Sequence, residues 1–174
     1  MQKYSRTAIA LHWLIALLII AAFLLGENMV DIPGITPTKL KYFSWHKWLG
    51  VTVLGLVAIR LLWRLKNPAP PYPDSMPGWQ KLASSSLHGL LYVLMFAIPV
   101  SGYLYSSAAG VPVVYLGVLP LPTLIDPSPE WKDILKSTHI ILNKVLLVAF
   151  ILHVAAAFKH LLIDRDGIFK RMLP

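Results

Sequence analysis

Cysteine is absent from this chain of 174 residues, and charged residues are few. Without cysteine the chain can form no disulfide, iron–sulfur cluster, thiolate zinc site or C-x-x-C-H haem attachment. Charged residues make up 14% of the chain and hydrophobic residues 56%, whereas soluble domains are about 25% charged. The chain lacks the polar coat that water demands, so the composition favours a membrane protein with lipid as its partner.

The net charge of +8 does not predict a nucleic-acid partner. A nucleic-acid-binding protein gathers its basic residues on one soluble face, whereas here they flank apolar runs. In a membrane protein the placement of the basic residues carries more information than their sum.

Four apolar runs are long enough to span a bilayer, at about residues 7–26, 45–65, 84–106 and 134–163. An uncharged run of about 20 residues covers about 30 Å, the thickness of the hydrocarbon core. The first run is not read as a signal peptide, because it is long and Gly26-Glu27-Asn28 provides no small-x-small cleavage site. We predict an all-α membrane protein, with residues 1–174 forming one domain, a bundle of four transmembrane helices.

The basic residues predict the orientation. Ten of the sixteen fall on the side shared by the two termini and the second loop: Lys3, Arg6, Arg60, Arg64, Lys66, Lys81, Lys159, Arg165, Lys170 and Arg171. Positively charged loops stay in the cytoplasm. We therefore expect both termini to be cytoplasmic.

Histidines are the main candidates for chemistry, and the fourth span carries the strongest signal. His139 and His153 are fourteen residues apart. In a helix this spacing is about 40° short of four turns and rises about 21 Å, so both imidazoles face the same way at two depths. Two haems stacked across a membrane need about this separation.

Each of these histidines has a partner at its own depth. His46 opens the second span on the outer side, level with His139, and His12 lies in the inner part of the first span, level with His153. A lone histidine on an apolar helix is more often a hydrogen-bonded core residue, but four in two depth-matched pairs are not explained that way. We predict an outer haem between His46 and His139 and an inner haem between His12 and His153. Two axial histidines leave the iron no open site, which suits electron transfer.

Two histidines remain near the inner side. His160, beside Lys159, lies on the haem-facing side of the fourth span about 10 Å below His153, where a quinone headgroup could meet it. The alternative is a hydrogen bond from His160 to a haem propionate or to lipid phosphate. His88 competes with His12 as the inner ligand on depth, or contacts quinone or a propionate.

Three arginines lie at the same inner level. Arg60 and Arg64 are four residues apart on one face of the second span, and Arg6 precedes the first span. They could hold the propionates of the inner haem through charge-assisted hydrogen bonds. They could equally form an ordinary cytoplasmic basic collar.

Several short strings follow one another along the chain. They are Tyr4-Ser5-Arg6, Leu11-His12-Trp13, Trp45-His46-Lys47-Trp48-Leu49-Gly50, Arg60-Leu61-Leu62-Trp63-Arg64, Leu87-His88-Gly89 and Asp164-Arg165-Asp166. In this order and spacing, the chain resembles the bacterial cytochrome b561 family over essentially its whole length.

The resemblance implies a multi-pass protein of the bacterial inner membrane that carries two b-type haems and exchanges electrons with quinone. It implies ligand roles for His12, His46, His139 and His153, in agreement with the depth argument. One branch is superoxide oxidase, which passes electrons from periplasmic superoxide to ubiquinone, with a quinone contact that matches His160. The third loop departs from that branch, so the electron donor stays open.

Two functions therefore compete. The first is transmembrane electron transfer coupled to quinone near the cytoplasmic side, with superoxide as a candidate donor. The second is a membrane anchor and electron conduit for a periplasmic or peripheral redox partner, docked on the third loop around Tyr115 and Trp131. A histidine-rich metal or proton transporter is disfavoured, because no acidic residue lies within the core of any span.

Overall fold

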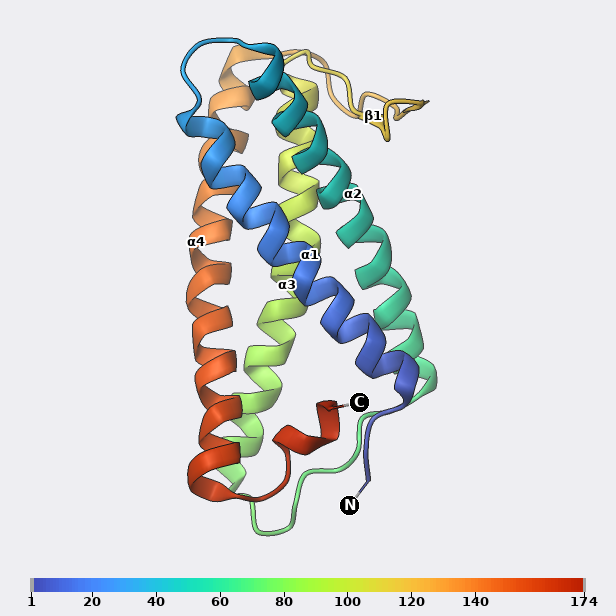
Figure 1. The fold of residues 1–174 in the computed structure, drawn as a ribbon, viewed down its shortest axis with the longest axis vertical. Coiled ribbons are helices and arrows are strands. Elements are labelled where there is room, and N and C mark those ends of the chain that lie inside the picture. Colours follow the sequence, from blue (N-terminus) through green and yellow to red (C-terminus); the bar gives the residue numbers. More distant parts are fainter. Residues whose placement is uncertain (1, 174) are drawn as a thin grey trace.

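Residues 2–173 are described by the computed structural model, and they form a bundle of four long helices (Figure 1). The helices are α1 (Arg6–Asp31), α2 (Pro37–Lys66), α3 (Gly78–Ala108) and α4 (Pro129–Lys159). Two short strands between α3 and α4, β1 (Val114–Tyr115) and β2 (Leu119–Pro120), pair as an antiparallel hairpin. A π-helix, η1 (His160–Asp164), continues α4, and a 3-10 helix, η2 (Phe169–Met172), follows. The predicted all-α bundle is confirmed.

Polar caps and prolines decide where three of the helices begin. The side chains of Ser5, Thr36 and Ser128 accept hydrogen bonds from the third backbone amides of α1, α2 and α4. Pro37 and Pro129 occupy the first position of α2 and α4, where the missing amide hydrogen costs nothing. These signals lie outside the apolar runs, which is why α1, α2 and α4 each begin before the predicted span.

The outer surface of the bundle is apolar. All four helices are long and hydrophobic enough to cross a membrane. Leu17, Leu62 and Ile141 each expose about 60% of their surface, at 63%, 61% and 60%. Side chains of this kind are stable on an outer surface when the surroundings are lipid. The chain is therefore a multi-pass membrane protein.

The two ends of the bundle differ. Residues at the start and the end of the described chain lie at one end, together with the linker from α2 to α3 (Figure 1). We call this the proximal end, and the opposite one, with the α1–α2 and α3–α4 connections, the distal end. At the proximal end the indole of Trp13 donates to the carbonyl of Met172 (2.8 Å), and Arg171 donates to the carbonyl of Pro71 (2.6 Å). The C-terminal segment thus ties α1 to the α2–α3 linker.

The packed core consists of two small clusters near the middle of the bundle. Ile15, Val53 and Val57 join α1 to α2, and a second cluster joins α3 to α4. The second cluster is formed by Leu94, Leu146 and Ala149. On α4 this cluster lies between His139 and His153 in the sequence, so packed side chains separate the two levels at which histidines occur.

Val57 provides a test of this packing, because it is completely buried. We expect Val57→Ala to lower the free energy of unfolding in detergent by roughly 2 kcal/mol, through lost contacts and the cavity left behind. The matched control is Ile59→Ala on the lipid-facing side of the same helix, where the side chain is 54% exposed. Unfolding followed by circular dichroism compares the two, and equal losses would contradict the packing described.

Candidate functional site

Four histidines meet in pairs at two levels of the bundle. At the distal level His46 of α2 faces His139 of α4, with ring centroids 6.2 Å apart. At the proximal level His12 of α1 faces His153 of α4, with ring centroids 6.1 Å apart. The structure thus brings together the partners that were matched by depth, and α4 supplies one ring to each pair.

Hydrogen bonds orient both rings of the distal pair. Nδ1 of His46 lies 3.0 Å from the carbonyl oxygen of Ala22, and Nδ1 of His139 lies 3.0 Å from that of Ile98. A carbonyl only accepts, so each Nδ1 carries the proton and each Nε2 keeps its lone pair. The hydroxyl of Ser101 lies 3.0 Å from Nδ1 of His139 and donates to the same Ile98 carbonyl. This is the arrangement that fixes a histidine as a metal ligand.

Glycines leave room for the distal rings. A Cβ atom on Gly102 would lie 2.9 Å from Cε1 of His139, and one on Gly26 would lie 3.2 Å from Cε1 of His46. The first distance is shorter than any side chain tolerates, so His139 occupies its position because residue 102 has no side chain. Gly50 is one turn from His46, and a Cβ there would meet nothing within 4 Å. A side chain at residue 50 would therefore meet no neighbouring group.

Three histidines share the proximal level. His88 of α3 also faces His153, with ring centroids 5.3 Å apart. Its Nδ1 donates to the carbonyl of Ser84 at 2.7 Å, which leaves Nε2 free. The geometry therefore keeps both candidates, His12 and His88, within reach of His153.

His160 lies in a network of charged groups where α4 becomes a π-helix. Nδ1 of His160 is 2.7 Å from a carboxylate oxygen of Asp166 and 3.2 Å from one of Asp164. Lys159 forms an ion pair with Asp164 at 2.5 Å. Arg165 adopts a left-handed conformation (φ 51°), which turns the chain so that Asp166 comes back to His160. π-Helical turns and left-handed non-glycine residues are both enriched at functional sites.

The three arginines predicted to hold haem propionates lie near the proximal end of the bundle, but their contacts differ. Arg60 donates to the carbonyl of Ala8 at 2.6 Å, and Arg64 lies over the ring of Tyr92, 5.6 Å from its centroid. Arg6 is exposed. Burial raises the pKa of Tyr4, although Arg64 opposes the shift, so this phenol stays neutral beside the basic groups.

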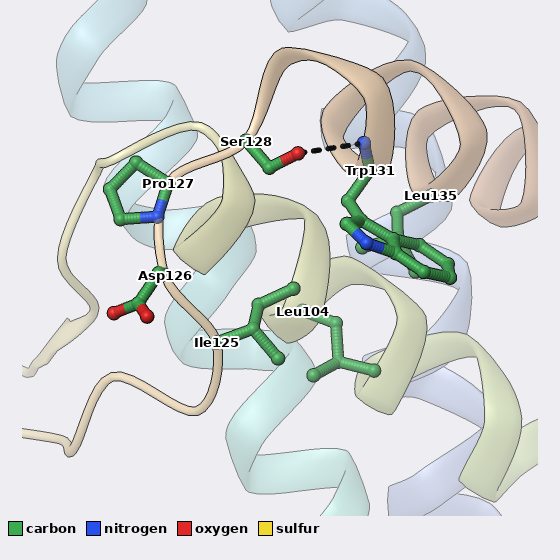
Figure 2. Close-up of a pocket in the computed structure, with 7 residues that line it drawn as sticks. All are labelled: Leu104, Ile125, Asp126, Pro127, Ser128, Trp131 and Leu135. Carbon is green, nitrogen blue, oxygen red and sulfur yellow. Dashed lines mark hydrogen bonds between the residues drawn. The ribbon is translucent and has the colours of Figure 1, made fainter.

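Two surface hollows lie away from these side chains. A hollow of about 380 Å³ lies at the distal end, between the end of α3 and the start of α4, and Figure 2 shows its lining residues. Leu104, Ile125, Trp131 and Leu135 make it apolar, and the carboxylate of Asp126 points away from them (Figure 2). The second, about 320 Å³, is an apolar groove between α3 and α4 with Lys144 in its lining. Neither is lined by any of the six histidines.

Comparison with known proteins identifies the family. The family model for prokaryotic cytochrome b561 matches residues 3–174. The chain belongs to this family. The predicted family membership is confirmed, and with it the place of the chain as a multi-pass protein of the bacterial inner membrane.

Several relatives align over nearly their whole length. Cytochrome b561 homolog 2 of Escherichia coli K12 is 34% identical over 99% of this chain and 92% of its own length. A probable superoxide oxidase of Yersinia pestis, CybB, is 29% identical over 99% of this chain and 97% of its own. Cytochrome b561 homolog 1 of E. coli K12 is 28% identical over 100% of this chain and 98% of its own. The family carries haem b and transfers electrons in the membrane, and these coarser statements hold for this cytochrome.

The spacing of the histidine pairs in this protein fits the binding of haem iron. Imidazole nitrogens bind first-row metals at roughly 2 Å, so two rings on opposite sides of one metal have centroids roughly 6 Å apart. The two pairs have spacings of 6.1 and 6.2 Å. The neutral nitrogen donors and the free Nε2 atoms of the distal pair agree with this fit.

Sequence reasoning missed the groups that hold the histidines in place. Ser101, Gly26 and the carbonyls of Ala22 and Ile98 were not singled out, and neither was Asp166 as the partner of His160. Ser101 stands directly before a glycine in an apolar span, which is only a weak signal of its role. Backbone carbonyls give no sequence signal, because every residue has one.

The close approach at Gly102 predicts a specific loss. We expect Gly102→Ala to displace His139 and to reduce the haem content of the purified protein by about half, measured as the pyridine haemochrome per chain. Gly55→Ala is the matched control, because a Cβ at Gly55 meets nothing within 4 Å. A Gly102→Ala protein with full haem content would show that the ring of His139 can move without consequence.

Proposed function

We propose that this cytochrome transfers electrons across the membrane between two b haems, one held by His46 and His139 and the other by His12 and His153. It exchanges these electrons with quinone at the proximal end. The observation that carries the proposal is the pair of facing imidazoles at each of two levels, with centroid spacings of 6.1 and 6.2 Å. When bound, each haem supplies a one-electron redox centre with no open coordination position.

The distance along α4 supports transfer between the two levels. His139 and His153 are fourteen residues apart on one continuous helix. The rise is about 21 Å, which covers most of a hydrocarbon core of about 30 Å. Because both rings lie on one helix, their separation is set by helical geometry and stays constant.

His12 is the better partner for His153 on distance. The spacing from His12 to His153 is 6.1 Å, close to the roughly 6 Å that two imidazoles on one metal require. His88 lies closer to His153, at 5.3 Å. We therefore assign the ligand role to His12, and we place His88 beside the proximal haem as a contact for a propionate or for quinone.

Quinone binding is proposed at His160, two turns of helix beyond His153. Reduction of a quinone to a quinol takes two electrons and two protons, so the site needs a group that exchanges protons. The Nδ1–H of His160 donates to Asp166, which directs Nε2 away from the carboxylates. Asp166 is itself held by the backbone amide of Ile168, 3.0 Å from its second oxygen. Asp166 thus acts as a positioning residue, with Lys159 paired to Asp164 beside it.

The basic residues of the proximal end are proposed to hold haem propionates. Arg60 and Arg64 reach into the bundle between α1 and α3, where they contact Ala8 and Tyr92. The hydroxyl of Tyr92 is buried and has no partner among the described residues. A carboxylate in this region would satisfy it and would pair with the arginines. Arg6 is exposed and takes the basic-collar role. This basic end is proposed to face the cytoplasm, as the charge distribution predicts.

Superoxide is the donor to examine first, because a relative 29% identical to this chain is described as a probable superoxide oxidase. The donor would reach the distal haem, which lies near the end opposite the termini. Lys47 is already engaged there, with its ammonium 3.5 Å from the carbonyl of Pro112. Lys41 lies over the ring of Trp45.

Haem counting tests the ligand assignment. We expect two b haems per chain in the purified protein and one in each of the variants His46→Ala, His139→Ala, His12→Ala and His153→Ala. Reduced-minus-oxidised spectra should separate the four variants into two classes, one for each haem. His88→Ala should keep both haems. If His88→Ala loses a haem and His12→Ala keeps two, the proximal ligand is His88.

Quinone coupling has its own test. We expect His160→Gln to slow oxidation of the dithionite-reduced protein by a short-chain quinone by roughly 100-fold, as loss of a proton-exchanging group does. Asp166→Asn should slow it by about tenfold and shift its pH profile, with the visible spectrum unchanged. The control is Asp74→Asn, an exposed carboxylate in the α2–α3 linker at the same end. Unchanged rates in both test variants would place the quinone elsewhere while leaving the haem assignment intact.

A further inference from the structure

The connection between α3 and α4 is unusually apolar. Residues 111–125 contain no charged side chain. At the turn of the β1–β2 hairpin the side chains of Leu116, Val118 and Leu119 are 56%, 80% and 54% exposed. Loops in water are polar, and exposed apolar patches of this kind mark a surface that something covers.

The hairpin lies against α2 at the distal end. The indole of Trp48 donates to the carbonyl of Val114 at 2.7 Å, and the hydroxyls of Tyr115 and Thr52 are 2.9 Å apart. From this attachment the turn projects sideways, away from the four helices (Figure 1). The hydroxyl of Tyr115 is therefore held against α2.

The attachment lies at hydrocarbon depth. His46 lies beside the last turns of the uncharged run of α1. Its Nδ1 donates to the carbonyl of Ala22, and a Cβ added to Gly26 would lie 3.2 Å from its ring. The first charged residue after this run is Glu27, so His46 is level with the outer boundary of the hydrocarbon. Thr52 is six residues further along α2, which is about 9 Å toward the centre of the bilayer. The hydroxyl of Tyr115 reaches the same depth.

The backbone of the hairpin is suited to lipid. The amides of Gly117, Val118 and Leu121 donate to carbonyls within the same segment, at 3.2, 3.2 and 2.9 Å. Backbone polar groups beside lipid must find their partners within the protein, so these bonds lower the cost of placing the turn there. Leu116 has a left-handed conformation (φ 53°) that turns in water usually give to glycine or asparagine. A leucine there places a large apolar side chain at the tip.

We infer that the β1–β2 hairpin is embedded in the acyl chains of the distal leaflet, with Leu116, Val118 and Leu119 in contact with lipid. The hairpin would act as a lateral anchor for α2 close to the distal histidine pair. The inference is independent of the haem and quinone assignments, because it rests on depth, apolar exposure and backbone hydrogen bonding alone.

Single cysteines test this placement, and the chain offers a background free of native cysteine. Val118→Cys would be compared with Glu130→Cys, an exposed charged position at the start of α4, and with Leu17→Cys on the lipid-facing side of α1. The proteins are placed in lipid nanodiscs, where both membrane faces are open to reagents. We expect a charged maleimide to label Val118→Cys at least tenfold more slowly than Glu130→Cys and about as slowly as Leu17→Cys.

Quenching by lipid distinguishes acyl chains from a protein cover. An environment-sensitive fluorophore, attached to each cysteine in detergent before reconstitution, should be quenched by nitroxide-labelled lipid at positions 118 and 17 but not at 130. Labelling of Val118→Cys as fast as that of Glu130→Cys would overturn the inference, because the hairpin would lie in water. Protection from maleimide without quenching would overturn it too, because a second copy or another protein would then cover the hairpin.

Discussion

The hydrogen bond from Nδ1 of a distal histidine to a backbone carbonyl is the interaction on which the site depends. For His46 the carbonyl belongs to Ala22 of α1, and for His139 it belongs to Ile98 of α3. Each bond crosses from one helix to another, so the ring is positioned only if the two helices are packed at the correct height. The same bond fixes the tautomer and leaves the lone pair of Nε2 available to a metal. Helix packing and ligand geometry are therefore one constraint in this bundle.

The apolar core is small and is confined to the middle of the bundle. The buried clusters around Val57 and around Leu146 lie between the two histidine levels and not at them. At the distal level glycine leaves room for the rings, as at Gly102. In a membrane the outer surface requires no burial, so a few close contacts in the middle are enough to hold the helices together.

Much of the fold was predictable from the sequence, and the reason is physical. Apolar runs of bilayer length with few charges have few alternatives to a transmembrane helix, so the four-helix bundle follows from the hydropathy pattern. His139 and His153 reveal a shared face because helical periodicity alone determines it. Helix ends were less accurate, since Thr36 and Ser128 cap α2 and α4 in polar segments that an apolar count does not include. The contact of Asp166 with His160 depends on a π-helix and on a left-handed Arg165, and neither has a signature in residue type. The sequence places His12 and His88 at the same depth, and the structure adds their ring-centroid distances from His153, 6.1 and 5.3 Å.

The tie between Trp13 and Met172 has a consequence for how the protein is made. The two residues are separated by 159 positions, yet one hydrogen bond joins them at the proximal end. A chain emerging from the ribosome inserts α1 first, and α1 then remains without this contact until residues 171 and 172 have been synthesised. His12 is adjacent to Trp13, so this contact, made only after all four helices have been synthesised, holds the part of α1 that carries a proximal histidine.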